Sequence, residues 1–558
     1  MEKIKTLWNR LDGRIDKIWP EEERKQPESE KKKLRERLGQ FFYLHRLELL
    51  YVLAMGGFLF FLSWILPFNK GPDEEMRYLV PQYIYKHGTL PAGWDPEIRH
   101  EIWGISYAFH PILPYVLGGW LMRLVGLFSD SEKALLMAAR FANILIGMGF
   151  YWYVQQIAKK LFSRRMFRYF FIALLSMLPQ LLYLFVYVNT DGIAIFSGAI
   201  IIYYWLAGME RKWDRRSCTG LAVAVAVCAL SYFTAYGYAL FSILLFVGTM
   251  AVFYREKGFK VWAGAVLKRG IYITVLVFLL TGWWFVRTAV LYDGDFLGLY
   301  APNKYGEMYA QEEFKPSNRE SVQEQGISLE EMLKTEDEGG MDWMRTTWRS
   351  FIGYFGFLEE PLGLDIYEIH KKIFALGFLG IGLYAGLALL YYIRVGMRRF
   401  LKGSPFGKAA WLQDKEEGAV LVRPSFVVDE GKIRGPNFWI LQISLGCCII
   451  IPILLSLYYS YCDDFQPQGR YVMPLVVPLM YFVTAGIQRF VTLFFRKWFV
   501  YIMMIPLFYG ILHVFLGAFV SVYIPAYAEG FSAWASIRFP WFSNQGWLMR
   551  ILYMLIPG

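Results

Sequence analysis

Charged and amide side chains stand beside long apolar runs at several places in this 558-residue chain. The densest group is Gly71-Pro72-Asp73-Glu74-Glu75-Met76-Arg77, which follows the first apolar run. Bringing carboxylates to a hydrocarbon boundary costs free energy through desolvation, so such a cluster indicates a functional site, with a solvated loop as the alternative. Similar groups occur later in the chain, at Asn189, Asp191, Arg287, Asp463, Asp464 and Arg470.

The composition identifies the class of protein that carries these groups. Hydrophobic residues make up 56% of the chain and aromatic residues 19%, which is typical of a polytopic helical membrane protein. The net charge of +11 comes from basic residues clustered in short loops, which the positive-inside rule explains better than nucleic-acid binding. The five cysteines indicate neither a disulfide framework nor a CxxC metal site.

Apolar periodicity and loop charge predict an all-α bundle of about eleven transmembrane helices. Residues 111–128 are interpreted as an interfacial helix, because a span there would place the basic segment 159–165 outside. The remaining chain divides into a cytoplasmic charged arm (1–46), a membrane domain (47–520) and an outer tail (521–558). The predicted spans are 47–67, 136–157, 168–187, 192–209, two within 218–254, 270–288, 371–394, 438–461, 471–488 and 498–520.

This topology places the polar groups on one side of the membrane. Outer loops are expected at 68–135 and 289–370, and a cytoplasmic loop at 395–436. Asp73, Glu74, Asn189, Asp191, Arg287, Asp463, Asp464 and Arg470 all fall on the outer side. A shared outer cavity is therefore a simpler interpretation than chance.

Several motifs resemble one known family. Gly71-Pro72-Asp73-Glu74 with Gly88-Thr89-Leu90-Pro91 is similar to the first outer loop of glycosyltransferases of the GT-C fold, in particular the protein-mannosyltransferase-like and aminoarabinose-transferase-like bacterial members. The resemblance covers roughly residues 47 to 490. Further segments that carry it are His110-Pro111-Ile112-Leu113-Pro114-Tyr115, Ala139-Arg140-Phe141, Asn189-Thr190-Asp191, Gly282-Trp283-Trp284-Phe285-Val286-Arg287 and Gln468-Gly469-Arg470-Tyr471-Val472-Met473-Pro474.

The resemblance implies an enzyme of the plasma (inner) membrane that moves a sugar from a polyprenyl-phosphate donor to an extracytoplasmic acceptor, with inversion at the anomeric carbon. Such a transfer needs a base for the acceptor hydroxyl, and desolvation or neighbouring carboxylates can raise a carboxyl pKa toward the working pH. Asp73 is the predicted base and Glu74 its support or alternate, because adjacent helical residues point about 100° apart. Glu75 is expected to be solvated.

The leaving phosphate gains negative charge, which a planar guanidinium can stabilise through two hydrogen bonds. Arg287 and Arg470 are the candidates, with Tyr471 near the second. Alternatively, Arg470 snorkels to the membrane surface or pairs with Asp463 or Asp464, and Arg287 caps the helix 270–288. Arg77, Asn189, Asp191, Asp463 and Asp464 are supporting cavity residues. Alternatively, Asp191 is an N-cap of the helix 192–209, and Asn189 or Thr190 shares that duty.

No cofactor is required by these patterns, although Asp73 and Glu74 could hold Mg²⁺ or Mn²⁺ through oxygen ligands. Two departures from the family pattern stand out: Arg77 occupies the place of a frequent His, and no Lys occurs around Ser231 to Thr234. A lipid-linked sugar transporter and a non-catalytic assembly protein are the competing functions. Transporters commonly bind at the midplane between repeated halves, whereas these polar groups gather at one face.

Overall fold

A computed structural model describes residues 34–402, 435–495 and 497–528. Within them the chain is helical, apart from turns, loops and one antiparallel pair of two-residue strands. Nine helices in these ranges are long and apolar enough to cross a membrane. They are α4 (Arg46–Ile65), α7 (Glu132–Leu161), α10 (Asp191–Arg211), α12 (Tyr236–Phe253) with the turn Phe233–Ala235, α13 (Phe259–Leu291), α17 (Leu364–Lys402), α18 (Pro436–Cys462), α19 with α20 (Gly469–Val472 and Val476–Phe494), and α21 with α22 (Lys497–Ala518 and Ile524–Tyr527).

Two shorter segments occupy the places of the other two predicted spans. One is α8 (Arg165–Ser176) followed by α9 (Pro179–Tyr183), and the other is α11 (Arg215–Ala229). A 15-residue helix such as α11 is about 22 Å long, which is less than the ~30 Å hydrocarbon thickness. The predicted bundle is therefore present, with two of its members short or broken.

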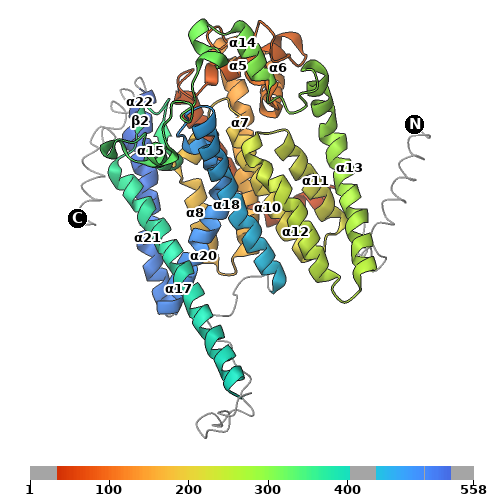
Figure 1. The fold of residues 1–558 in the computed structure, drawn as a ribbon, viewed down its shortest axis with the longest axis vertical. Helices are drawn as coiled ribbons and strands as arrows, with labels where there is room; N and C mark the ends of the chain where they lie inside the picture. Colours follow the sequence, from red (N-terminus) through yellow and green to blue (C-terminus); the bar gives the residue numbers. More distant parts are fainter. Residues whose placement is uncertain (1–33, 403–434, 496, 529–558) are drawn as a thin grey trace.

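Ion pairs between helices define the two ends of the bundle. At one end, Lys159 and Lys160 of α7 pair with Glu48 of α4 and Glu210 of α10. At the other end, Arg140 near the start of α7 pairs with Glu74. The short helices α5 (Glu74–His87), α6 (Leu113–Val125) and α14 (Ala301–Tyr309) lie together at this second end (Figure 1). We call it the outer end, following the predicted topology.

The helix α6 bears out the prediction of a non-spanning segment. It has 13 residues, too few to cross a bilayer, and it packs against α5 and α7. Gly119 allows this approach, because a Cβ there would lie 2.6 Å from the side chain of Ile84. The first outer loop is thus anchored on the membrane helices.

The second outer loop forms small elements, of which α14 packs on the first outer loop and the later ones cover the outer ends of α18 and α19. They are α14, α15 (Leu329–Leu333), α16 (Trp343–Ile352), β1 (Tyr354–Phe355), β2 (Glu360–Pro361) and short 3-10 turns. Val322, Met332 and Trp343 form a cluster against Tyr461 and Phe465. This loop is therefore a cover packed on the bundle.

Two predicted boundaries shift in the structure. The helix α17 continues to Lys402, into the segment expected to be the loop 395–436. The last helix reaches Tyr527, so residues 521–527 belong to it instead of to a tail. Residues 34–44 form helix α3 within the predicted arm. Residues 1–33, 403–434, 496 and 529–558 lie outside the described residues. They include Trp534, Trp541 and Trp547, which the sequence predicts to be membrane-interface anchors.

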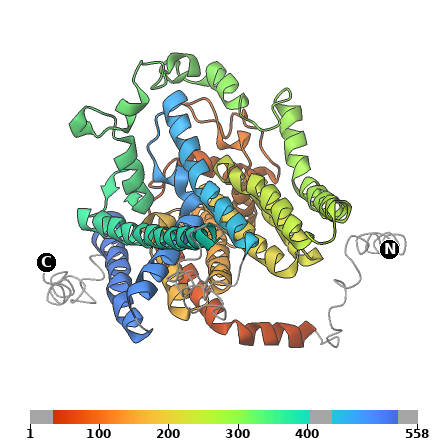
Figure 2. The same cartoon turned by 60° about the horizontal axis from the view of Figure 1, so that its bottom comes forward.

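The helices differ in how much of their surface faces the bundle. The helix α10 is central, with 83% of its apolar window buried, whereas only 6% of that window is buried in α13. Figure 2 shows α13 at the edge of the bundle and α17 lying across it. The outer end of α10 therefore lies among other helices, where Asp191 at its first residue must find protein partners.

Candidate active site

The loop that carries Asp73 is pressed against the segment before α10. Gly71 is required there, because a Cβ would lie 2.4 Å from the ring of Tyr187. The hydroxyl of Tyr183 donates to the carbonyl of Lys70 over 2.6 Å. Contacts between segments more than a hundred residues apart therefore determine where Asp73 lies.

The backbone of Asp73 adopts a left-handed conformation, with φ 60° and ψ 17°. Few residues other than glycine adopt this conformation, and such strain is concentrated at functional sites. Asp73 occupies the N-cap of α5, yet its side chain makes no capping hydrogen bond. Its carboxylate is therefore available for contacts outside the helix.

Two guanidinium groups hold the Asp73 carboxylate. Arg470 NH2 donates to Oδ2 over 2.9 Å, and Arg77 NH2 donates to the same oxygen over 3.4 Å. The Asp73 side chain is 28% exposed, whereas those of both arginines are 5% exposed. The structure thus brings together Asp73, Arg77 and Arg470, three of the predicted site residues.

This pairing reverses the expected direction of the Asp73 pKa. Burial acts to raise it, but the charges of Arg470 and Arg77 and hydrogen bonds from Arg470 and Tyr107 outweigh burial and hold the pKa well below its usual range. The expectation of a raised pKa is therefore wrong for this arrangement, because arginines, not other carboxylates, surround the group. Asp73 is ionised at neutral pH.

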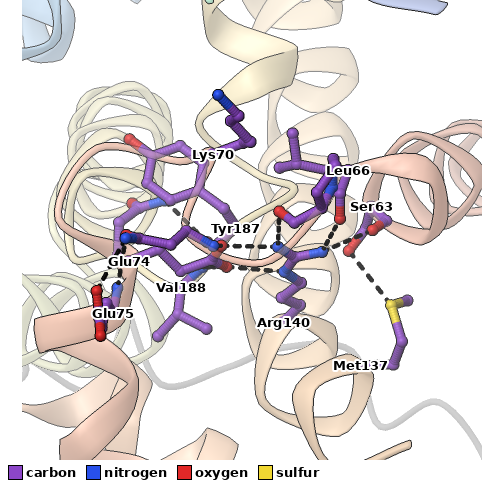
Figure 3. Close-up of polar contacts among 12 residues, drawn as sticks. Ser63, Leu66, Lys70, Glu74, Glu75, Met137, Arg140, Tyr187 and Val188 are labelled. Carbon is purple, nitrogen blue, oxygen red and sulfur yellow. Dashed lines mark hydrogen bonds and ion pairs between the residues drawn. The ribbon is translucent and has the colours of Figure 1, made fainter. Parts of the chain in front are cut away.

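Glu74 faces a different partner. Its carboxylate is fully buried and accepts two hydrogen bonds from Arg140, each 2.7 Å long. The backbone N–H groups of Asn69 and Val188 donate to the same carboxylate over 3.2 Å and 3.1 Å. Figure 3 shows Glu74 and Arg140 pointing toward each other. These contacts fix the position of the loop and occupy both oxygens of the Glu74 carboxylate.

Arg140 completes this anchor with three more hydrogen bonds. Its NH1 donates to the carbonyls of Ser63 and Leu66 over 2.8 Å and 2.7 Å, and its NH2 to the carbonyl of Pro67 over 3.0 Å. These carbonyls lie at the outer end of α4 or just beyond it, where no backbone donor follows. The Arg140–Glu74 pair therefore joins α4, α7 and α5 (Figure 3).

Arg470 has hydrogen-bond donors that are not used. Its NH2 donates to Asp73 and to the hydroxyl of Tyr471, which is 2.9 Å away. Its Nε and NH1 are buried and have no hydrogen-bond partner among the described residues. Leaving a charged donor unpaired in the interior costs free energy. The guanidinium therefore has two donors available for a further acceptor.

A relay of polar groups runs outward from Arg470. The Tyr471 hydroxyl donates to Oε1 of Gln466, whose amide nitrogen donates to Asp464. Asp464 thus lies at the end of this relay and makes no ion pair with Arg470. Asp463 is the C-cap residue of α18, and no ion pair of Asp463 is present among the described residues. The proposed pairing of Arg470 with Asp463 or Asp464 is therefore not found, and Asp73 takes that place.

Arg77 links Asp73 to the start of α10. Its NH1 lies 3.8 Å from Oδ2 of Asp191 and 3.4 Å from the Thr190 hydroxyl, to which it donates. Its guanidinium carbon lies 4.4 Å above the ring of Tyr107, a favourable cation–π distance. Arg77 and Asp191 therefore belong to the same buried cluster as Asp73.

Asn189 acts locally. Its amide donates to the carbonyls of Leu184 and Tyr187, and its Oδ1 accepts from the Gly192 N–H over 3.0 Å. The last bond satisfies a free N–H in the first turn of α10. The capping alternative therefore describes Asn189 well.

Arg287 lies apart from this cluster. Its NH2 donates to the carbonyls of Leu90 and Pro91, over 3.3 Å and 2.8 Å. The hydroxyl of nearby Tyr292 accepts from the Gly93 N–H over 2.8 Å. Among the described residues Arg287 makes no contact with Asp73 or Arg470. Arg287 and Tyr292 thus fasten the first outer loop to α13, while NH1 of Arg287 is buried without a hydrogen-bond partner among the described residues.

The residues present do not fit a divalent metal. Within the described part of the chain no group of three or more His, Cys, Asp or Glu side chains lies close enough to hold an ion. The Asp73 carboxylate forms ion pairs with two arginines, and the Glu74 carboxylate forms one with a third. Cationic neighbours repel a metal ion, and the two carboxylates share no partner. We therefore assign no metal to Asp73 and Glu74.

Buried tyrosines complete the cluster. Tyr107 contributes a hydrogen bond to Asp73, and Tyr115 contributes hydrogen bonds with Arg77 and Thr190. The hydroxyl of Tyr187 is buried without a hydrogen-bond partner among the described residues. Tyrosines near a membrane surface usually indicate an interface belt. These tyrosines differ from those of an interface belt only in lying close to two buried arginines, and this proximity depends on the fold.

Beside Asp73 and Arg470 lies a cavity of about 60 Å³. It is lined by those two residues, by Gln180 and by the loop around Gly356. This volume admits water but not a sugar. A ligand larger than water therefore needs movement of the surrounding loops.

Comparisons with known proteins find similarity only in solved structures. No family model matches the chain, and no curated protein matches it. ArnT from Cupriavidus metallidurans bound to undecaprenyl phosphate is 15% identical over 79% of this chain and 60% of that one, with a TM-score of 0.39. The archaeal oligosaccharyltransferase AglB from Archaeoglobus fulgidus, in complex with an inhibitory peptide and a dolichol-phosphate, is 12% identical over 83% of this chain and 55% of that one, with a TM-score of 0.41. These TM-scores are too low for the likeness to assign a function by itself.

Proposed function

We propose that this chain is a membrane glycosyltransferase that moves a sugar from a polyprenyl-phosphate donor to an acceptor on the outer, extracytoplasmic face. The observation that carries the proposal is the buried Arg470 guanidinium, which holds Asp73 while its Nε and NH1 have no hydrogen-bond partner among the described residues. A base and an unsaturated anion-binding group thus lie in direct contact. Transfer from a phosphate carrier requires both.

Arg470 binds the donor phosphate in this mechanism. Its Nε and NH1 have no partner among the described residues, and each can donate one hydrogen bond to a phosphate oxygen. A bidentate contact also needs NH2, which becomes available when the phosphate displaces Asp73 from it, and burial strengthens these hydrogen bonds. Arg77, whose Nε is also buried and finds no hydrogen-bond partner in the described part of the chain, supports the same charge. Both arginines stabilise the phosphate as it gains charge in the transition state.

Donor binding also prepares Asp73 to act as a base. Without donor, the charges of Arg77 and Arg470 balance those of Asp73 and Asp191. A phosphodiester adds one negative charge and competes with Asp73 for Arg470, so the affinity of Asp73 for a proton rises. Donor binding thereby raises the pKa of Asp73 from its low value in the empty site.

The chemical step is a single displacement. The acceptor oxygen attacks the anomeric carbon, the bond from that carbon to the phosphate oxygen breaks, and the electron pair leaves with the phosphate. Asp73 accepts the hydroxyl proton. Attack opposite the leaving group inverts the anomeric configuration, and the released polyprenyl phosphate stays on Arg470 until it is exchanged.

Binding of polyprenyl phosphate to the purified full chain tests the first half of the proposal. Arg470→Gln should weaken binding by about 10- to 100-fold, since hydrogen bonds to charged groups contribute roughly 1.5–3 kcal/mol. Arg123→Gln, which alters an exposed arginine of α6, is the matched control and should bind like the wild type. Equal affinities in all three proteins would contradict the phosphate site.

Transfer itself is tested by the release of polyprenyl phosphate from a set of polyprenyl-phosphate sugars. Release that depends on an added acceptor supports the glycosyltransferase. Movement of the donor across a vesicle membrane without release would contradict it and favour a transporter.

A further inference from the structure

A second and larger cavity lies beside the candidate active site. Its volume is about 600 Å³, and it is formed by the outer end of α4, one face of α5 and the start of α7. Pockets of this size with aromatic walls and a few polar groups are typical of small-molecule sites. Its lining includes Trp64, Phe68, Glu75, Tyr78, Glu132 and Lys133.

The helix α5 separates this cavity from Asp73. Arg77 lies four residues after Asp73 and pairs with it, whereas Glu75, Tyr78 and Gln82 line the larger cavity. Arg140 also lines the cavity, but its guanidinium already donates hydrogen bonds to Glu74 and to three carbonyls (Figure 3). The remaining charged lining groups therefore determine which ligand fits.

Those groups carry a net charge of −1, from Glu75 and Glu132 against Lys133. Neither Glu132 nor Lys133 has a hydrogen bond or ion pair within the described part of the chain, although the Lys133 ammonium lies 4.0 Å from the centre of the Trp64 ring. The aromatic wall thus already accommodates one ammonium group. The charge balance disfavours a purely anionic ligand and suits one that carries an amine.

The place of Lys133 suits a phosphate as well. It lies in the first turn of α7, which Ser131 caps by accepting from the Ala134 N–H, and a helix N-terminus favours negative charge. The cavity therefore offers a cationic point for a phosphate and two carboxylates with aromatic rings for an ammonium. Both kinds of group occur together in a zwitterionic lipid headgroup.

The surroundings indicate that the ligand comes from the membrane. Trp64 is 50% exposed, and Phe60 and Leu53 on the same helix are 40% and 62% exposed. These side chains belong to α4, a helix that can cross the membrane. Acyl chains can therefore lie along α4 while the headgroup enters the cavity.

We propose that this cavity binds the headgroup of an aminophospholipid, with its phosphate on Lys133 and its ammonium between Glu75 and Glu132. Glu75 also accepts a hydrogen bond from Asn69 over 2.9 Å, and Asn69 belongs to the loop that carries Asp73. An occupied cavity therefore stiffens that loop. The inference concerns binding and holds whether or not the chain transfers sugar.

The test is native mass spectrometry of the full chain in a polyoxyethylene detergent. Phosphatidylethanolamine, phosphatidylglycerol and a neutral diglucosyl diacylglycerol with the same acyl chains are titrated separately. One phosphatidylethanolamine should bind at least tenfold more tightly than either other lipid. Equal affinities, or tighter binding of the glycolipid, would overturn the proposal.

Variants locate the site. Glu132→Gln and Lys133→Met should each weaken phosphatidylethanolamine at least fivefold, and both positions are exposed, so folding should tolerate them. Glu75→Gln is a third variant with the same expectation. Glu368→Gln, in an exposed pair with Lys371 on α17, is the matched control. Unchanged affinity in all three cavity variants would overturn the assignment.

Discussion

Replacing Glu74 by glutamine tests whether the carboxylate next to Asp73 is a structural anchor. The Glu74 and Arg140 side chains are 0% and 1% exposed and joined by two hydrogen bonds of 2.7 Å. Glutamine keeps the shape but removes the negative charge, which leaves the Arg140 guanidinium buried without a counter-ion. Breaking a buried ion pair in this way costs about 3–5 kcal/mol.

The assay is reversible unfolding of the full chain in mixed micelles, followed by tryptophan fluorescence. Glu74→Gln should lose about 3–5 kcal/mol of unfolding free energy. The double variant Glu74→Leu with Arg140→Met removes both charges, so its loss should be smaller than the sum of the losses of the two single variants. It should still be less stable than the wild type, because the carbonyls that Arg140 binds and the N–H groups that Glu74 binds lose their partners. Asp73→Asn should cost less, because the Asp73 side chain is 28% exposed and water screens its ion pairs.

Two outcomes would refute this reasoning. If Glu74→Gln unfolds within about 0.5 kcal/mol of the wild type, as a surface substitution does, the pair is no anchor. If Asp73→Asn destabilises the protein more than Glu74→Gln, the roles of the two carboxylates are the reverse of those assigned.

Three further predictions concern the outer end of the bundle. Burial and the charge of Arg77 lower the pKa of His110 from 6.5 to about 4, so between these pH values only the unfolded chain takes up this proton. The free energy of unfolding should therefore decrease by up to about 3 kcal/mol as the pH is lowered from 6.5 to 4. In His110→Gln this decrease should be smaller, and an equal decrease in both proteins would contradict the burial of His110. Arg287→Gln frees the Leu90 and Pro91 carbonyls and should lower the melting temperature while leaving the Kd for polyprenyl phosphate within about twofold; a tenfold weaker Kd would restore the phosphate role expected from sequence. Gly469→Ala would bring a Cβ within 2.1 Å of the Phe351 nitrogen, so it should weaken polyprenyl phosphate binding by displacing Arg470; wild-type affinity would show that this backbone contact does not position the arginine.

Much of this arrangement could be predicted from the chain alone because membrane proteins obey strong constraints. Long apolar runs and basic loops determine the spans and their direction, and that direction was enough to place Asp73, Asp191 and Arg470 at one end. The structure confirms their proximity, although Asp73 and Arg470 are 397 residues apart in the sequence.

What could not be predicted is which partner each charged group takes. Asp73 and Glu74 are neighbours in the chain, yet one pairs with Arg470 and the other with Arg140. The left-handed backbone at Asp73 separates their directions, and no periodicity signals it. Because the sequence does not reveal these partners, it also predicts the wrong direction for the shift of the Asp73 pKa. The charges of the two arginines outweigh the effect of burial there.

Arg287 shows a second limit. Its place at the outer end of an apolar helix resembles that of Arg470, and sequence position alone cannot distinguish them. The helix α13 is peripheral, with 6% of its apolar window buried, so Arg287 meets the first outer loop and not the buried cluster. The difference between the two arginines is one of packing.

Turnover and binding measured together on Asp73→Asn give the most direct test of the central claim. Removing the carboxylate takes away the base but also frees Arg470 from its present partner. The release of polyprenyl phosphate from the cognate donor should fall by at least about 100-fold, while the Kd for polyprenyl phosphate stays equal or becomes tighter. Wild-type turnover in this variant, or a loss of turnover that merely follows a loss of binding, would contradict the account.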